Sequence, residues 1–218
     1  MTLEVRNLDC VRSEREVFSG LSFALRPGEA LVLRGANGSG KTSLLRIVAG
    51  LLKPAGGALL WDGVAVGEDP GAYRARLCYV GHLDALKAAF TVAENLAFWA
   101  ALGGRPGGEG AALERFGLGH LAEIPARLLS AGQRRRLGLA RIIAAPATLW
   151  LLDEPTVSLD EQSVAILIEV VDEHRAEGGM VMAATHVDIG LAAAAVLNLS
   201  EDGAATGARA GARAGARA

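Results

Sequence analysis

Residues 35–42 read Gly-Ala-Asn-Gly-Ser-Gly-Lys-Thr, and their types and spacing suit the binding of phosphate. Glycines allow successive backbone N–H groups to turn toward one anion. We expect Lys41 to reach the β- and γ-phosphates of a nucleotide and the Thr42 hydroxyl to ligate magnesium. The loop lies between an apolar run and a helical pattern, so the positive end of the helix would add to the site. The residues expected to bind the nucleotide here are Gly35, Ala36, Asn37, Gly38, Ser39, Gly40, Lys41 and Thr42.

A second group of chemically useful residues follows the apolar run Leu149-Trp150-Leu151-Leu152. Such a run predicts a buried strand that ends at Asp153 and Glu154, at the edge of the sheet where ligands bind. Asp153 then suits a role beside magnesium, and Glu154 is the best candidate to orient and deprotonate an attacking water. An acid pair alone is often a solvated strand end, but the glycine loop upstream favours the catalytic interpretation.

A third candidate is the segment Leu129-Ser130-Ala131-Gly132-Gln133. Ser130 precedes apolar residues at helical spacing and is predicted to cap the start of a helix. A capped helix start with small neighbours can bind an anion, although an ordinary cap would have the same sequence. The basic run Arg134-Arg135-Arg136 is predicted to be a solvated helix face, with the alternative that one arginine steers nucleotide.

The elements that must position these residues follow from periodicity, turn residues and apolar runs. They indicate an α/β fold with a mainly helical stretch in the middle of the chain. Strands are predicted at 2–8, about 21–25, 30–33 and 180–184, with a strand pair near 58–66 that turns at Asp62-Gly63. Helices are predicted at 43–52, at 91–102 within a helical insertion of about 82–128, and near 161–176.

The composition of the 218-residue chain excludes few classes of protein. Its net charge of -2 and pI near 6.1 give no general attraction to nucleic acid, and no nucleic-acid partner is expected. Cys10 and Cys78 are predicted to be free, buried thiols. No stretch is apolar enough to span a membrane. The last twelve residues, 207–218, are three Gly-Ala-Arg-Ala repeats and are predicted to be a disordered tail, with the alternative that this basic tail contacts anionic lipid or a partner.

In order and spacing, the motifs resemble those of ABC ATPases from residue 2 to about residue 200. Leu129–Gln133 is similar to the ABC signature, Ser158-Leu159-Asp160 to the D-loop, Thr185-His186 to the H-loop and Tyr79-Val80-Gly81-His82 to the Q-loop. The resemblance implies a P-loop NTPase (ABC ATPase) core with an N-terminal antiparallel β subdomain and a small helical insertion, all within residues 1–206. It implies catalytic roles for Glu154, His186 and Lys41. It also implies that Ser130, Gly132 and Gln133 close on the γ-phosphate held by a second subunit.

Within this family the chain most resembles the ATP-binding subunit of the cytochrome c biogenesis haem exporter. The resemblance rests on softer features than the nucleotide motifs, and among them are Phe18–Phe23, Leu86-Lys87, Thr91–Leu96, Ala147–Trp150 and the alanine in the signature. His82 replaces the usual Q-loop glutamine, which puts metal contact by this residue in doubt. No aromatic residue stands where adenine is usually stacked, and Arg12, Cys10 and Phe18 are competing candidates.

The resemblance implies an ATP-dependent homodimer. With ATP and Mg²⁺ as cofactors, it would hydrolyse ATP as a peripheral subunit at the cytoplasmic face of the inner membrane. Integral membrane subunits would dock on the helical insertion, and haem would be the indirect substrate. The alternatives are the ATPase of another ABC exporter and, with less support, a soluble ABC protein that acts on DNA or ribosomes. A small-molecule P-loop kinase would lack the Ser130 segment.

Overall fold

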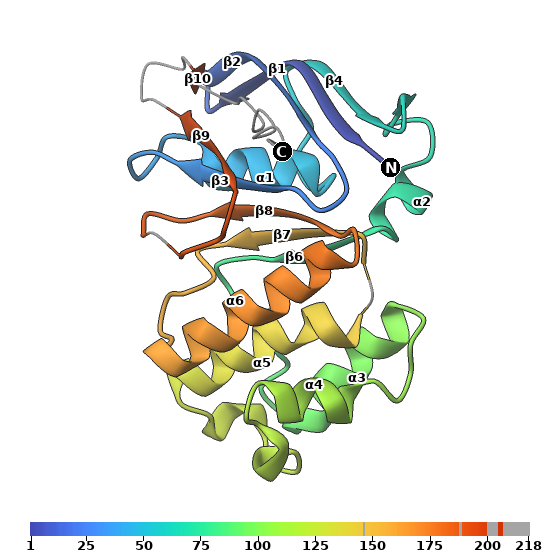
Figure 1. The fold of residues 1–218 in the computed structure, drawn as a ribbon, viewed down its shortest axis with the longest axis vertical. Coiled ribbons are helices and arrows are strands. Elements are labelled where there is room, and N and C mark those ends of the chain that lie inside the picture. Colours follow the sequence, from blue (N-terminus) through green and yellow to red (C-terminus); the bar gives the residue numbers. More distant parts are fainter. Residues whose placement is uncertain (146, 188, 200–204, 207–218) are drawn as a thin grey trace, which may run out of the picture.

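The computed structural model describes residues 1–145, 147–187, 189–199 and 205–206. Their elements form two sheets with helices between and below them (Figure 1). The strands are β1 (Leu3–Arg12), β2 (Arg15–Leu25), β3 (Ala30–Arg34), β4 (Gly56–Trp61), β5 (Val64–Ala65), β6 (Leu77–Val80), β7 (Leu149–Asp153), β8 (Met180–Ala184), β9 (Ala195–Leu199) and β10 (Ala205–Thr206). The helices are α1 (Lys41–Val48), α2 (Pro70–Arg74), α3 (Val92–Leu102), α4 (Glu109–Arg115), α5 (Ala131–Ala144) and α6 (Glu161–Ala176), with 3₁₀ turns at Gly119–Leu121 and Ala126–Leu128.

The two sheets differ in strand direction. The smaller sheet has the order β2-β1-β4-β5 and is antiparallel. The larger sheet has the order β10-β9-β3-β8-β7-β6, and its strands from β9 to β6 are parallel. The carboxyl ends of β3, β7 and β8 therefore meet at one edge, which is the edge expected to bind ligand.

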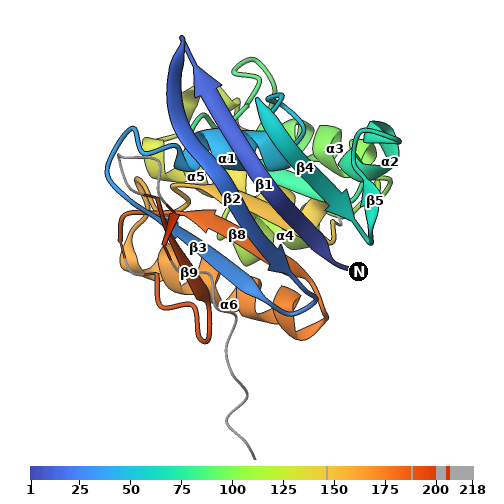
Figure 2. The same ribbon diagram turned by 90° about the horizontal axis from the view of Figure 1, so that it is seen from above.

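The central strands β3, β7 and β8 of the larger sheet are buried on both faces, which explains their continuous apolar sequences. Side chains alternate along β7: Leu149 and Leu151 pack into the core that contains α1 and the smaller sheet, whereas Trp150 and Leu152 pack into the core that contains α3 to α6. Figure 1 shows α1 between the two sheets, with α5 and α6 below the larger one. Seen from above, β1, β2 and β4 lie over α1 (Figure 2).

The predicted elements agree with most of this arrangement. The helix at 161–176, the strand at 180–184 and the turn at Asp62-Gly63 are confirmed. The first two strands are longer than predicted, because β1 and β2 continue as a hairpin whose outer residues are exposed. Helices α3 and α4 lie in the stretch 82–128, but the division of the chain into domains stays a prediction. The predicted tail lies outside the described residues.

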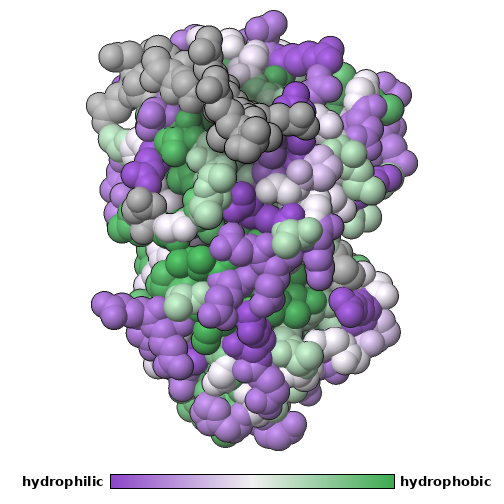
Figure 3. Space-filling view, viewed as in Figure 1, coloured by the Kyte–Doolittle hydropathy of each residue, from purple (hydrophilic) through white to green (hydrophobic). Residues whose placement is uncertain are grey.

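The outer surface of α6 is hydrophilic. Glu161, Glu169 and Glu173 lie exposed on it, and Figure 3 shows the hydrophilic stripe that runs along this helix. Neither α6 nor any other helix in the described part of the chain has the length and apolar character needed to cross a bilayer.

Candidate functional site

The predicted phosphate loop joins β3 to α1 and lies at the left edge of Figure 1. Gly40 occupies the N-cap position of α1 with φ 99°, and it supplies no side chain to cap the helix. The N–H groups of the first helical turn therefore remain available to an anion. A Cβ on Gly40 would lie 2.6 Å from Cγ1 of Val17, so glycine is required here for space as well as for conformation.

Lys41 folds back over this loop. Its Nζ donates to the carbonyl oxygens of Gly35 at 2.7 Å and Ala36 at 2.9 Å, and the residue is buried. Ala36, Asn37 and Gly38 are exposed at the tip of the loop, while Ser39 is buried beneath them. The ammonium group thus lies inside the curve of the loop, where a phosphate chain would be enclosed by backbone N–H groups.

Thr42, in the first turn of α1, meets Asp153, the last residue of β7. Thr42 Oγ1 donates to Asp153 Oδ1 at 3.0 Å, although the two residues are 111 positions apart in the chain. Asp153 is the last residue of β7 and is only 2% exposed. A hydroxyl and a carboxylate at hydrogen-bond distance are oxygen ligands of the kind that Mg²⁺ takes together with phosphate oxygens, so the donor set fits that metal.

Tyr79 at the end of β6 is a neighbour of this pair that the residue pattern did not single out for a role. Its hydroxyl donates to Asp153 Oδ2 at 3.4 Å. Burial, followed by the charge of Asp153, raises the pKa of the phenol, so Tyr79 stays protonated and remains a donor. The position of Tyr79–His82 among the motifs identifies this segment, but no local pattern in the sequence predicts that the tyrosine faces Asp153.

Glu154 and His186 form a second pair at the same edge. His186 Nδ1 lies 2.9 Å from Glu154 Oε2, with Glu154 mostly buried and His186 exposed. The Glu154 N–H donates to the Ala184 carbonyl oxygen at 2.8 Å, which continues the β7–β8 pairing beyond Asp153. Glu154 has φ 48°, a conformation uncommon for a residue other than glycine. The backbone therefore turns sharply just after β7, at the residue whose carboxylate meets His186.

Ser130 caps α5, as predicted. Its Oγ accepts from the Gln133 N–H at 3.2 Å, and Gln133 Oε1 accepts from the Ser130 N–H at 2.8 Å. The Gln133 carboxamide oxygen is thus part of the cap. Gly132 packs against the D-loop, since a Cβ there would lie 3.0 Å from the Ser158 carbonyl oxygen. Within the described ranges, no hydrogen bond joins residues 130–133 to residues 35–42.

The prediction for Arg134-Arg135-Arg136 is wrong at Arg135. This side chain is 4% exposed and points inward, where it donates to backbone carbonyl groups at the end of β7. The helix places the middle arginine of the run toward the sheet, whereas Arg134 donates to Leu129 and Arg136 to Phe116. A run of three like residues on a helix cannot share one face, since successive positions rotate by about 100°.

The remaining candidates lie around the site. His82 is exposed and lines a small cavity of about 150 Å³ between the start of α5 and the D-loop. Of the three candidates for stacking on adenine, Cys10 and Phe18 are buried, and Arg12 is exposed at the end of β1. Arg12 is therefore the one of the three whose side chain a base could reach.

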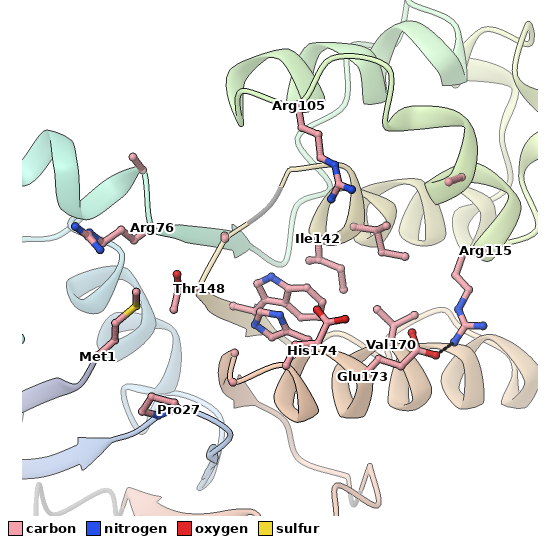
Figure 4. Close-up of a pocket in the computed structure, with 18 residues that line it drawn as sticks. Met1, Pro27, Arg76, Arg105, Arg115, Ile142, Thr148, Val170, Glu173 and His174 are labelled. Atoms are coloured by element: carbon pink, nitrogen blue, oxygen red, sulfur yellow. Dashed lines mark hydrogen bonds and ion pairs between the residues drawn. The ribbon is translucent and has the colours of Figure 1, made fainter.

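A larger hollow lies at the opposite edge of the large sheet. It measures about 930 Å³ and is formed around the start of β7 and the end of α6, where His174 stacks on Trp150 with ring centroids 3.7 Å apart. Arg76, Arg105 and Arg115 reach its rim, and Arg115 pairs with Glu173 (Figure 4). It contains none of the predicted nucleotide residues.

Comparisons with known proteins place this arrangement in a family. Residues 18–157 match the family described as ABC transporter. The chain is 56% identical over 207 residues to the cytochrome c biogenesis ATP-binding export protein CcmA of Paramagnetospirillum magneticum, an alignment that covers 92% of this chain and 94% of that protein. It is 57% identical over 196 residues to the protein of the same name from Rhodospirillum rubrum, with 88% and 83% covered.

A solved structure has the same fold. The ATP binding subunit of an ABC transporter superposes with a TM-score of 0.85 at 24% identity, and the match covers 94% of this chain and 90% of that one. Three observations indicate the same family. They are the order of the elements, the sheet edge that carries Lys41, Asp153 and Glu154, and the identity to the two sequence relatives. The chain therefore belongs to the ABC transporter family, as an ATPase subunit.

Proposed function

We propose that the chain binds Mg²⁺-ATP at the edge formed by β3, β7 and β8 and hydrolyses it between two copies of itself. The observation that carries the proposal is the pairing of Thr42 with Asp153 at 3.0 Å beside that of Glu154 with His186 at 2.9 Å. These pairs bring together a metal-binding donor set and an acid–base pair next to the phosphate loop. Such an arrangement suits the in-line attack of water on a terminal phosphate.

Each residue has a separate part in this proposal. Lys41 and the first-turn N–H groups of α1 hold the phosphates, and Thr42 and Asp153 would hold Mg²⁺, which neutralises charge on the phosphate oxygens when bound. Glu154 orients the water and accepts its proton. His186, already within hydrogen-bond distance of Glu154, steadies the carboxylate and reaches toward the terminal phosphate.

The substitution Glu154→Gln tests this assignment, because it keeps the size of the side chain and removes the base. ATP binding should survive, steady-state hydrolysis should fall by two orders of magnitude or more, on the scale of about 10²–10⁴ for a general base, and a nucleotide-bound dimer should accumulate. Glu68→Gln, at an exposed position away from the site, is the matched control and should behave as wild type. Hydrolysis at the wild-type rate by the Glu154 variant would remove that residue from its role.

The position of the Ser130 segment supports a second copy. Its helix start is exposed and capped but has no bond to the phosphate loop of its own chain among the described residues. A second copy turned head to tail would place Ser130, Gly132 and Gln133, at the start of its α5, against the terminal phosphate. The nucleotide would then be enclosed between the two copies. Dimer formation that depends on ATP, measured by light scattering with Glu154→Gln, is the expected result.

The stretch 82–128 supports the docking of a membrane subunit. Leu83, Phe90, Phe98, Leu102 and Leu128 are large apolar residues that lie exposed in this stretch. Exposed apolar groups of this size favour a protein partner. The buried Asn95 fixes part of this surface: its side chain accepts from the Lys87 N–H at 2.7 Å and donates to the carbonyl oxygens of Lys87 and Thr91.

The relatives' name suggests the process that the hydrolysis serves. We infer that the complex takes part in cytochrome c biogenesis, with haem as the indirect substrate and the chain bound peripherally at the cytoplasmic face of the inner membrane. Purification of the tagged chain from its own membranes should recover an integral membrane partner whose fraction shows haem absorbance. A partner without haem would redirect the proposal to another exported substrate.

A further inference from the structure

Arg135 makes more polar contacts than either neighbouring arginine of α5. Nε donates to the Pro155 carbonyl oxygen at 3.3 Å, and Nη2 donates to those of Asp153 at 2.9 Å and Glu154 at 2.8 Å. Nη1 donates to the Gly81 carbonyl oxygen at 2.9 Å and to Asp84 Oδ1 at 3.2 Å. The guanidinium has five N–H donors, and these contacts give it five acceptors.

The environment of this side chain is almost closed to solvent. Arg135 is 4% exposed, and Asp84, 24% exposed, is the carboxylate with which it forms an ion pair among the described residues. Removal of the guanidinium or of one of its acceptors leaves buried polar groups without hydrogen-bond partners, which lowers the stability of the fold. The five acceptors come from two separate stretches of chain: residues 153–155 after β7, and residues 81–84, where the segment toward the helical insertion begins.

We propose that Arg135 is a positioning residue for catalysis, which fixes the Glu154 backbone in place and ties it to residues 81–84. The proposal deepens the hydrolytic role given above and rests on it. Among the described residues, the hydrogen bonds of Arg135 go to residues 81–84 and 153–155, and none goes to the phosphate loop. Arg135 acts through Glu154, whose carbonyl oxygen it holds, while Ala184 holds the N–H of the same residue.

The backbone of Glu154 explains why such a support is needed. At φ 48° the residue is in a conformation that costs free energy and persists only when the surroundings hold it. Hydrogen bonds from one rigid, planar group to three successive carbonyl oxygens hold this turn from one side. Without them the turn relaxes, and the carboxylate leaves the place where it meets the attacking water.

The first test compares Arg135→Gln with Arg136→Gln, which removes a neighbouring guanidinium that bonds only Phe116 among the described residues. For Arg135→Gln we expect kcat for ATP to fall about 10- to 100-fold, as a misplaced catalytic group does, while KM for ATP stays within about twofold. The control should keep both values. An unchanged kcat in the Arg135 variant would overturn the proposal.

A second measurement separates positioning from loss of folded protein. Arg135→Gln is combined with Glu154→Gln, and the slow residual hydrolysis is followed in single turnover. If Arg135 acts through the Glu154 carboxylate, the double variant should hydrolyse ATP no more slowly than Glu154→Gln alone. If Arg135→Gln lowers the hydrolysis rate of the Glu154→Gln variant by the same factor as it lowers that of wild type, its role is generally structural and the proposal is overturned.

Two milder variants cover the case in which Arg135→Gln fails to fold. Arg135→Lys keeps the charge but offers three donors from one point, and Asp84→Asn removes only the carboxylate at the other end. Both should lower kcat at constant KM, Lys more than Asn, and wild-type kcat in both would refute the inference. Absence of hydrolysis in wild type, or wild-type hydrolysis in Glu154→Gln, would instead count against the proposed function.

Discussion

Replacement of Thr42 by valine removes one oxygen atom from the site and little else. Threonine and valine have nearly the same shape and the same β-branched backbone preference, so the start of α1 should be preserved. The hydroxyl lost is the group that donates to Asp153 Oδ1 at 3.0 Å. Among the residues that the structure describes, the Asp153 carboxylate would keep one hydrogen bond, the longer one from Tyr79 to its other oxygen at 3.4 Å. A carboxylate that is 2% exposed would then be short of a donor.

The size of the effect follows from the bond that is lost. A hydrogen bond to a charged group contributes about 1.5–3 kcal/mol, and leaving one partner buried forfeits this contribution. We therefore expect the free energy of unfolding to fall by about 2 kcal/mol without nucleotide, since Thr42 itself is only partly buried. For a chain of this size that corresponds to a decrease in Tm of about 4–8 °C. Thr42→Ser keeps the donor and should lose much less.

The assay is thermal unfolding of wild type, Thr42→Val and Thr42→Ser, each with no ligand, with ADP and EDTA, and with ADP and Mg²⁺. Mg²⁺ should raise the Tm of the nucleotide-bound wild type and of the nucleotide-bound serine variant further, because a bound ligand stabilises the folded chain by an amount that grows with the logarithm of its concentration over Kd. It should not raise the Tm of the valine variant. Equal Tm values for the valine and serine variants without ligand would refute the reasoning from the Thr42–Asp153 bond. An undiminished Mg²⁺ effect in the valine variant would refute the metal-binding role.

Two further predictions concern stability. Burial lowers the pKa of His174 below its ordinary value of 6.5, so the fold favours the neutral imidazole and the free energy of unfolding should fall as the pH decreases below about 6.5. In urea unfolding between pH 7 and 5, His174→Phe should reduce this pH dependence, whereas His120→Phe, at an exposed position, should not. The same pH dependence in wild type and His174→Phe would contradict the prediction. Gly40→Ala should lower the free energy of unfolding by about 1–3 kcal/mol more than Gly63→Ala, because both glycines have positive φ but, of the two, Gly40 alone is crowded by a neighbour. Denaturant unfolding of the two variants measures this difference. Equal losses of stability would contradict the prediction and show that a small shift of the β1–β2 hairpin relieves the crowding.

Much of the fold could be predicted because local signals and tertiary structure agree. The strand at 180–184 is apolar on both faces and buried on both, and the helix at 161–176 begins with the Asp160 cap and keeps a helical apolar pattern. The loop at Gly35–Thr42 and the acids after β7 are local motifs whose order in the chain fixes their place at one edge. For these elements the sequence carries the necessary information in short stretches.

The rest depended on contacts between distant segments. Nothing local distinguishes Arg135 from Arg134 and Arg136, since only the packing of α5 against the end of β7 decides which of them is buried. Ser130 and Gln133 have the spacing of a capping box, so the role of the Gln133 side chain in the cap follows from a local pattern that the sequence contains. Tyr79 faces Asp153 only because β6 and β7 are neighbours in the sheet.

In the described part of the chain, no hydrogen bond joins the Ser130 helix start to the phosphate loop, and this separation has a genetic consequence. Under the proposed head-to-tail pairing, a chain with a defective Ser130 still carries a sound phosphate loop, and a chain with a defective Lys41 still carries a sound helix start. Two inactive alleles of these kinds, expressed together, would form mixed dimers in which one composite site is intact. They should therefore complement each other, whereas two alleles altered at Lys41 and Glu154, which lie on the same side of the site, should not.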